Sequence, residues 1–121
     1  MRQQVKIKTA VFLNDELIFN TDQTIHFKNI KATGQMLVDS NAFSFIYIME
    51  IDQSYTYLVF PEHIWTDLRK MLEIEIPVFI KLDEWKVELS NIHNELQYLI
   101  ENIKGNRNYG EEMVQKVEST F

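Results

Sequence analysis

The chain of 121 residues contains no cysteine. This absence excludes disulfide bonds, thiolate metal ligands and a cysteine nucleophile, and it is typical of proteins in a reducing compartment. No segment approaches the ~20 consecutive apolar residues that a helix needs to cross a bilayer. Residues 1–6 contain no apolar run followed by a small-residue cleavage site, so we predict no secretory signal. Together these absences predict a soluble, cytoplasmic protein that does not bind membranes.

Basic residues are few relative to acidic ones. The sequence has 12 Lys and Arg against 18 Asp and Glu, which gives a formal net charge of −6 at pH 7. A negative protein repels the phosphate backbone unless its basic residues gather on one surface, and the sequence contains no strong basic stripe. We therefore predict that nucleic acid is not a partner.

Apolar residues, in contrast, are plentiful. Hydrophobic residues make up 45% of the chain and aromatic residues 12%, which is typical of a folded globular protein. The length is close to the most common size of one domain, and we find no repeat, low-complexity tract or linker. We predict a single α+β domain over residues 1–121: a mainly antiparallel sheet with about three helices, concentrated after Pro61, on one face.

Alternation of apolar and polar residues predicts the strands before Pro61. In residues 5–13, Val5, Ile7, Val11 and Leu13 fall on one face, which predicts one strand with that face buried. The other predictions in this half are a returning strand from Leu17 to Phe19, a short strand over 24–27, a loop over 28–33, a strand or helical turn over 36–38, and a turn at Asp39-Ser40-Asn41. Residues 43–50 and 55–60 are apolar on both faces, which predicts two central strands joined as a hairpin and flanked by the first strand pair.

After Pro61, the apolar spacing predicts a helix whose buried face includes Trp65. Pro77 ends the helical region, and strands follow from Val78 and from Trp85. Each tryptophan falls at a core-facing position of its element, so we predict that both pack in the core.

Residues 89–121 form the best-specified segment: a helix, a loop rich in asparagine and glycine, and a second helix. Ser90 is the predicted N-cap of the first helix, and Gly105 its left-handed C-terminal cap. Asn108 and Glu111 resemble a capping box that starts the second helix. That helix would bury Met113, Val114 and Val117, with Phe121 as a further candidate.

The loop tip between these helices is a possible interaction site formed by Asn106, Arg107, Asn108 and Tyr109. Exposed backbone N–H groups at a helix start also bind anions. However, Glu111 and Glu112 would repel phosphate there, and the phosphate-loop pattern Gly-Lys-Ser/Thr is absent. A structural role therefore ranks first, an interaction surface second and an anion site third.

We predict no catalytic residue, no metal site and no cofactor. His26, His63 and His93 lie in three different elements with no metal-ligand spacing. Ser40 follows Asp39 but lacks the Gly-x-Ser-x-Gly context of a serine nucleophile, so a turn is the simpler interpretation. The alternative is a small-ligand-binding protein or a hydrolase-like enzyme, in which Asp39 and Ser40 meet one of the histidines.

Two motifs carry a resemblance to known proteins: Gly34-Gln35-Met36-Leu37-Val38-Asp39-Ser40 and Asn102-Ile103-Lys104-Gly105-Asn106-Arg107-Asn108-Tyr109-Gly110. They resemble a family of short, uncharacterised proteins from low-GC Gram-positive bacteria, and the resemblance covers nearly the whole chain. The family pattern often has an acidic residue where this chain has Asn41, which weakens a catalytic role for that turn. The resemblance implies a cytoplasmic bacterial setting and brings no catalytic residue. We therefore predict a non-enzymatic module that binds another protein or forms a homodimer.

Overall fold

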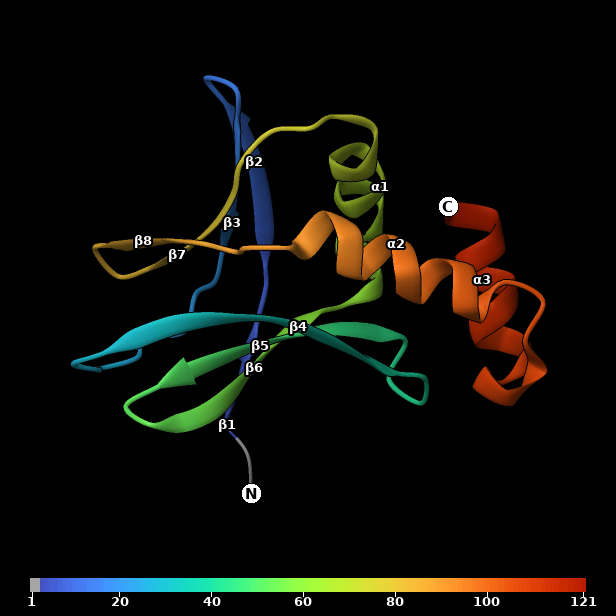
Figure 1. Cartoon of the computed structure of the whole chain (residues 1–121), viewed down its shortest axis with the longest axis horizontal. Helices are drawn as coiled ribbons and strands as arrows, with labels where there is room; N and C mark the ends of the chain where they lie inside the picture. The colour runs from blue at the N-terminus through green and yellow to red at the C-terminus, as the bar shows by residue number, and fades with distance from the viewer. Residues whose placement is uncertain (1–2) are drawn as a thin grey trace.

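The computed structural model describes residues 3–121, which form two four-stranded sheets and three helices (Figure 1). Sheet A has the order β1-β6-β5-β4, and sheet B has the order β2-β3-β7-β8. The strands are β1 (Gln3–Lys6), β2 (Thr9–Leu13), β3 (Glu16–Asn20), β4 (Ile30–Asp39), β5 (Ser44–Ile51), β6 (Ser54–Phe60), β7 (Val78–Leu82) and β8 (Trp85–Glu88). The helices are α1 (Trp65–Glu73), α2 (Ile92–Ile103) and α3 (Glu111–Thr120), with short 3-10 helices η1 (Glu62–Ile64) and η2 (Arg107–Tyr109).

The predicted α+β class is confirmed, and all three helices follow Pro61. Each sheet has two antiparallel pairs and one parallel pair, β1 with β6 and β3 with β7, so the pairing is mainly antiparallel. The strands lie in two sheets where we predicted one. Within residues 3–121 no helix is long and apolar enough to span a membrane.

The single strand predicted over residues 5–13 is wrong, because the chain changes sheets in the middle of it. The N–H of Ile7 still donates to Val59 of sheet A (2.9 Å), whereas the N–H of Lys8 donates to Asn20 of sheet B (2.8 Å). Val5 and Ile7 are buried, but Val11 and Leu13 are 44% and 53% exposed. The crossing turns the second half of the segment away from the core, so its apolar side chains do not share one buried face. The first strand pair also does not flank the central hairpin, since β2 and β3 belong to sheet B.

The connection from β3 to β4 also differs from the prediction. Residues 24–27 form no strand, and most of the predicted loop over 28–33 belongs to β4. The Asp52 carboxylate accepts hydrogen bonds from the N–H groups of Lys28 and Asn29 (2.9 and 2.8 Å), which fixes the start of β4. A bulge between Ala32 and Met36 contains Gly34 at φ +75°, a left-handed conformation that suits glycine. The bulge interrupts the alternation of apolar and polar residues along β4, so the sequence did not indicate the first half of the strand.

The central hairpin is confirmed. β5 and β6 pair antiparallel in the middle of sheet A, and the turn between them places Asp52 and Gln53 at positive φ. The strands predicted from Val78 and from Trp85 pair as β7 and β8, also as predicted. The turn predicted at Asp39-Ser40-Asn41 is confirmed with shifted bounds: Asp39 ends β4, the turn covers residues 40–43, and Asp39 Oδ1 accepts from the N–H of Ala42 (3.2 Å).

One continuous hydrophobic core joins both sheets to the helices. Trp65 is 1% exposed, and its ring packs 5.2 Å from Phe45 and 5.9 Å from Phe121, as predicted for a core tryptophan. The buried face of α3 is confirmed: Met113, Val114 and Val117 are buried, and Phe121 is partly buried against the same core. The prediction for Trp85 is wrong, because this side chain is 52% exposed.

The helix ends agree with the prediction in one of three cases. Gly105 follows α2 with φ +71°, as a left-handed cap requires. The N-cap of α2 is Asn91, in a left-handed conformation with φ 64°, rather than Ser90. No capping box starts α3: its N-cap is Gly110, and the neighbouring Asn106 side chain accepts from the N–H of Asn108 (3.1 Å) within η2.

Candidate interaction surface

β2 is an edge strand with an exposed, uncharged sequence. It stands at the end of the strand order of sheet B and pairs with β3 on one side. Its sequence Thr-Ala-Val-Phe-Leu contains no charge and no proline. Val11, Phe12 and Leu13 are 44%, 37% and 53% exposed (β2 stands beside β3 in Figure 1). Edge strands in natural proteins are usually guarded by charges, proline, bulges or covering segments, so this strand is a candidate for pairing with another chain.

The hairpin geometry predicts which backbone groups β2 leaves unpaired. Asn14 and Asp15 both have positive φ, as in a type I′ turn, and Leu13 and Glu16 flank this turn as partners. In such a hairpin the flanking pair bonds inward, and the direction then alternates along the strand. The N–H and C=O groups of Ala10 and Phe12 therefore point away from β3.

The face of sheet B that points away from the core carries an apolar strip, which we call the outer strip: Val11, Leu13, Ile18 and Phe79. Val11 is the register partner of Ile18, and Ile18 is the register partner of Phe79. Their chain neighbours Leu17 and Phe19 point the other way and are fully buried. At the far side of the strip, Lys86 Nζ lies 4.6 Å from the centre of the Phe79 ring and 2.9 Å from Glu16. The strip is thus open on the β2 side.

The other three sheet edges are guarded. On β1, the Gln23 side chain accepts from the N–H of Lys6 (2.7 Å) and donates to the C=O of Gln4 (3.1 Å). On β4, the Glu95 carboxylate of α2 accepts from the N–H of Met36 (3.3 Å). β8 is short and carries two charged residues among its four. Among the four edge strands in the described part of the chain, only β2 lacks such protection.

The predicted interaction loop lies at one end of the molecule, between α2 and α3 and away from β2 (Figure 1). Arg107 and Asn108 are exposed, whereas Tyr109 is half-buried against the core. The loop is held internally by Asn106, and by Glu118, whose carboxylate accepts from the N–H of Gly105 (2.9 Å). An interaction role for Asn106, Arg107, Asn108 and Tyr109 stays a prediction.

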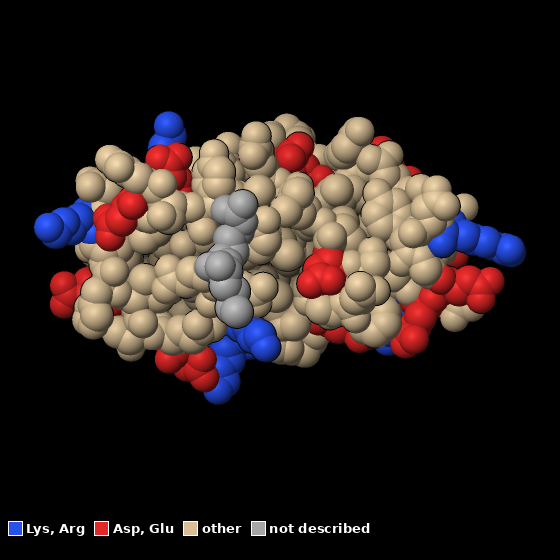
Figure 2. All heavy atoms as spheres, turned by 90° about the horizontal axis from the view of Figure 1, so that it is seen from below, with Lys and Arg blue, Asp and Glu red and all other residues tan. Residues whose placement is uncertain are grey.

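Charged side chains do not gather into a basic surface on the face seen in Figure 2. Lysine and arginine side chains lie toward the edges of that face, and acidic side chains lie both at its edges and farther in. This distribution agrees with the absence of a basic stripe in the sequence.

The structure places the three histidines apart. His63 Nε2 lies 3.0 Å from the carbonyl oxygen of Lys8. His26 lines a hollow with residues of the β7–β8 turn, and His93 lines another with the segment before β7. Within residues 3–121 no hydrogen bond joins a histidine to Asp39 or Ser40, and no group of three or more metal-ligating side chains forms.

Sequence reasoning missed the contact that fastens β4 to α2. The Tyr47 hydroxyl donates to the C=O of Ser90 (2.7 Å) and accepts from the N–H of Gly34 (3.1 Å). Burial raises the pKa of the Tyr47 phenol above its usual value of 10.0. A tyrosine at an inward position of a central strand signals a buried hydroxyl that needs partners. Its partner Ser90, however, lies 43 positions along the chain, and nothing in the sequence links the two.

Comparison with known proteins identifies relatives along the whole chain. Residues 5–121 match the model of a family of unknown function, UPF0738. A UPF0738 protein from Bacillus pumilus is 42% identical over 121 residues, and the UPF0738 protein YjbL of Bacillus subtilis is 40% identical over 121 residues. Each alignment covers 100% of this chain and 99% of the relative. No solved structure matches the chain. The chain belongs to the UPF0738 family, whose function is unknown.

Proposed function

We propose that this protein is a non-enzymatic self-association module, in which β2 of one copy pairs antiparallel with β2 of a second copy. The single observation that carries the proposal is the unguarded edge of β2, where three consecutive apolar side chains are exposed. The pairing would join the two copies of sheet B into one continuous eight-stranded sheet, and it would satisfy the outward backbone groups of Ala10 and Phe12.

A twofold axis at Val11 gives a consistent register. Ala10 then lies opposite Phe12 of the second copy, so the outward N–H and C=O groups of both residues meet in hydrogen-bonded pairs. The small alanine side chain leaves room for the phenylalanine ring across the pair. The same axis brings the outer strips of the two copies together, and Val11 meets its own counterpart at the centre.

The charges around β2 favour the antiparallel arrangement of two copies. Lys8 precedes the strand, and Asp15 and Glu16 follow it. Antiparallel pairing places the positive end of one strand beside the negative end of the other, whereas parallel pairing would place like charges together. Lys8 already lies 2.9 Å from Asp22, but both side chains are more than 60% exposed, so this ion pair contributes little and can rearrange. This self-complementary pattern supports a second copy as the occupant.

We propose that the association takes place in the cytoplasm, the location predicted from the absence of cysteine. A contact formed by one five-residue strand and the outer strip is small, and small interfaces belong to weak, reversible complexes. Each copy carries a net charge of −6, so we expect added salt to strengthen the association by screening repulsion.

Sedimentation equilibrium over a wide range of protein concentrations, at about 0.15 M NaCl, tests the proposal. We expect wild-type protein to shift from monomer to dimer as its concentration rises. Val11→Lys places two like charges together at the twofold axis and should abolish the dimer. The matched control is Leu37→Lys, which puts the same charge on an exposed residue of the guarded strand β4 and should leave the dimer intact.

Hydrogen exchange gives an independent readout on the same samples. The amides of Ala10 and Phe12 should become protected as the dimer forms, while the amides of Val11 and Leu13 are protected in the monomer as well. A protein that stays monomeric at all concentrations would contradict the proposal. So would a dimer that survives Val11→Lys, or capture of an extended segment of another protein by β2 without self-pairing.

A further inference from the structure

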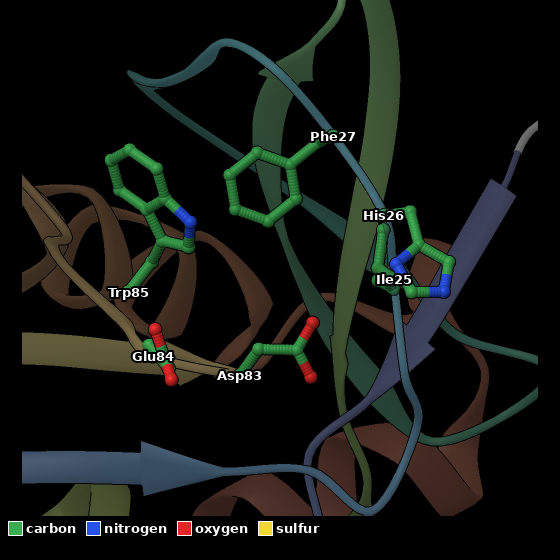
Figure 3. Close-up of a pocket in the computed structure, with 6 residues that line it drawn as sticks. All are labelled: Ile25, His26, Phe27, Asp83, Glu84 and Trp85. Carbon is green, nitrogen blue, oxygen red and sulfur yellow. The ribbon is translucent and has the colours of Figure 1, made fainter.

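A second site lies away from β2, in a hollow between the β7–β8 turn and the connection from β3 to β4. The hollow has a volume of about 360 Å³ and is lined by Ile25, His26, Phe27, Asp83, Glu84 and Trp85. Figure 3 shows the Trp85 indole and the Phe27 ring side by side, with the Asp83 carboxylate facing the same space. The ring centres are 5.5 Å apart.

The exposure of Trp85 is the unusual feature of this hollow. Trp85 is the register partner of Leu82, so it stands on the core-facing side of sheet B. Leu82 is 1% exposed, yet Trp85 is 52% exposed because its ring reaches past the core into the hollow. An exposed tryptophan face leaves a large apolar surface in water, although the ring does pack against Phe27.

The charge of the hollow is negative. Asp83 and Glu84 sit together in the turn, and the hollow has no lysine or arginine in its lining. Within residues 3–121 neither carboxylate takes part in a hydrogen bond or an ion pair, in contrast to Glu16, which binds Lys86 on the other face of the same sheet. Both carboxylates are therefore available to a ligand.

We propose that this hollow binds an organic cation, an alkylammonium or guanidinium group, between the Trp85 ring and the carboxylates of Asp83 and Glu84. The face of an indole ring attracts a cation more strongly than the other aromatic side chains do, and a nearby carboxylate adds a charge-assisted hydrogen bond. An apolar wall favours an organic cation over a hydrated metal ion, which would keep its water shell. The cation can come from a free amine or from an arginine side chain of a polypeptide.

Nuclear magnetic resonance of the two indole N–H groups tests the proposal, since Trp65 is buried and serves as an internal control. The probes are butylammonium chloride for a free amine and N-acetyl-arginine amide for a polypeptide side chain, each compared with NaCl at equal ionic strength. We expect a saturable shift of the Trp85 signal with at least one organic probe and no shift of Trp65. The tighter probe identifies the source of the cation.

Variants separate the two parts of the site. Trp85→Leu, and the double change Asp83→Asn with Glu84→Gln, should each weaken binding at least tenfold. The matched control is Asp15→Asn, an acidic turn residue of the other hairpin in sheet B, which should bind as the wild type does. If circular dichroism shows that Trp85→Leu is unfolded, the binding measured for the double variant alone tests the inference.

Three results would overturn the inference: shifts that NaCl or MgCl₂ reproduces, a response that rises without saturation, or full binding by the double variant. None of these measurements depends on the oligomeric state. A failure of β2 pairing would therefore leave the proposed cation site untouched.

Discussion

The two long edges of this molecule, β2 and β4, are built in opposite ways. β4 is covered. Met36 is 6% exposed, and α2 lies along the strand, where the Glu95 carboxylate accepts a hydrogen bond from the N–H of Met36. β2 is bare: it has no bulge and no charge, no side chain within residues 3–121 forms a hydrogen bond to its backbone, and three consecutive apolar residues are exposed. Both strands end a sheet of the same size, so sheet size does not explain the difference.

The edge at β4 is closed by the fold, whereas the edge at β2 is left exposed. Closing β4 required a glycine bulge, a buried tyrosine hydroxyl and an acidic residue on α2, all placed by the tertiary structure. An edge strand that persists without such protection is prone to pair with another chain. We expect changes at β4 to reduce stability and changes at β2 to affect association.

The largest difference should come from removing apolar side chains at the two edges. Met36→Ala deletes a buried side chain under α2 and should lower the free energy of unfolding by about 2–5 kcal/mol. Leu13→Ala removes a side chain that is 53% exposed and should change it by about 0.5 kcal/mol or less at concentrations where the protein is monomeric. Urea unfolding at low protein concentration measures both. Equal losses at the two positions would show that β2 is covered in the monomer.

The next largest effect should come from Tyr47→Phe, which removes the hydroxyl between β4 and α2. The C=O of Ser90 and the N–H of Gly34 each lose a partner, which should cost about 1–3 kcal/mol. Tyr98→Phe is the control, because Tyr98 is 63% exposed. Denaturant unfolding of the two variants gives the difference, and similar values for both would mean that this hydroxyl does not fasten the edge.

The same hydroxyl gives a direction for the pH dependence. Because burial raises the pKa of Tyr47, the folded protein keeps the phenol neutral to higher pH than the unfolded chain does. Stability is therefore complete below about pH 10 and falls as pH rises above the unfolded pKa. Tyr47→Phe should remove this part of the alkaline loss, which unfolding measured between about pH 9 and 11 would detect.

Local patterns predicted the parts of the fold that depend on near neighbours in sequence. The central hairpin, the helical region after Pro61 and the left-handed Gly105 all follow from spacing or from one residue's conformational preference. The errors share a cause. Val5 and Val11 have the same alternation, and only the passage between sheets at Lys8 decides which of them is buried.

The position of the candidate surface was not predictable from the sequence. We predicted a protein-interaction module and favoured the loop between α2 and α3, because loops rich in glycine and asparagine stand out in a sequence. The edge position of β2 depends on strand order, which the alternation of residues does not encode. The prediction for Trp85 failed for a similar reason. The alternation along β8 places Trp85 on the core-facing side of the sheet, but the core ends at Leu82, its register partner on β7.

The smallest effect concerns the carboxylate that fixes the start of β4. The backbone N–H groups of Asn29 and Lys28 donate to Asp52 and lower the pKa of its carboxyl below the usual 3.8. A lowered pKa means that ionised Asp52 stabilises the fold above the unfolded pKa, and that this contribution is lost as pH falls toward the folded pKa. Asp52→Asn keeps the shape and the tolerance of positive φ, so it removes mainly the charge.

We therefore expect Asp52→Asn to lower the melting temperature slightly at pH 7, with the difference from wild type shrinking as pH falls below about 4. Asp15→Asn is the matched control, since Asp15 also has positive φ but sits in the turn beside the bare edge, where no backbone N–H within residues 3–121 donates to its carboxylate. At concentrations where the protein is monomeric, the melting temperature of Asp15→Asn should stay at the wild-type value at every pH tested. If the two variants follow the same pH profile, the start of β4 is no more firmly held than the end of β2, and the contrast between the edges would rest on α2 alone.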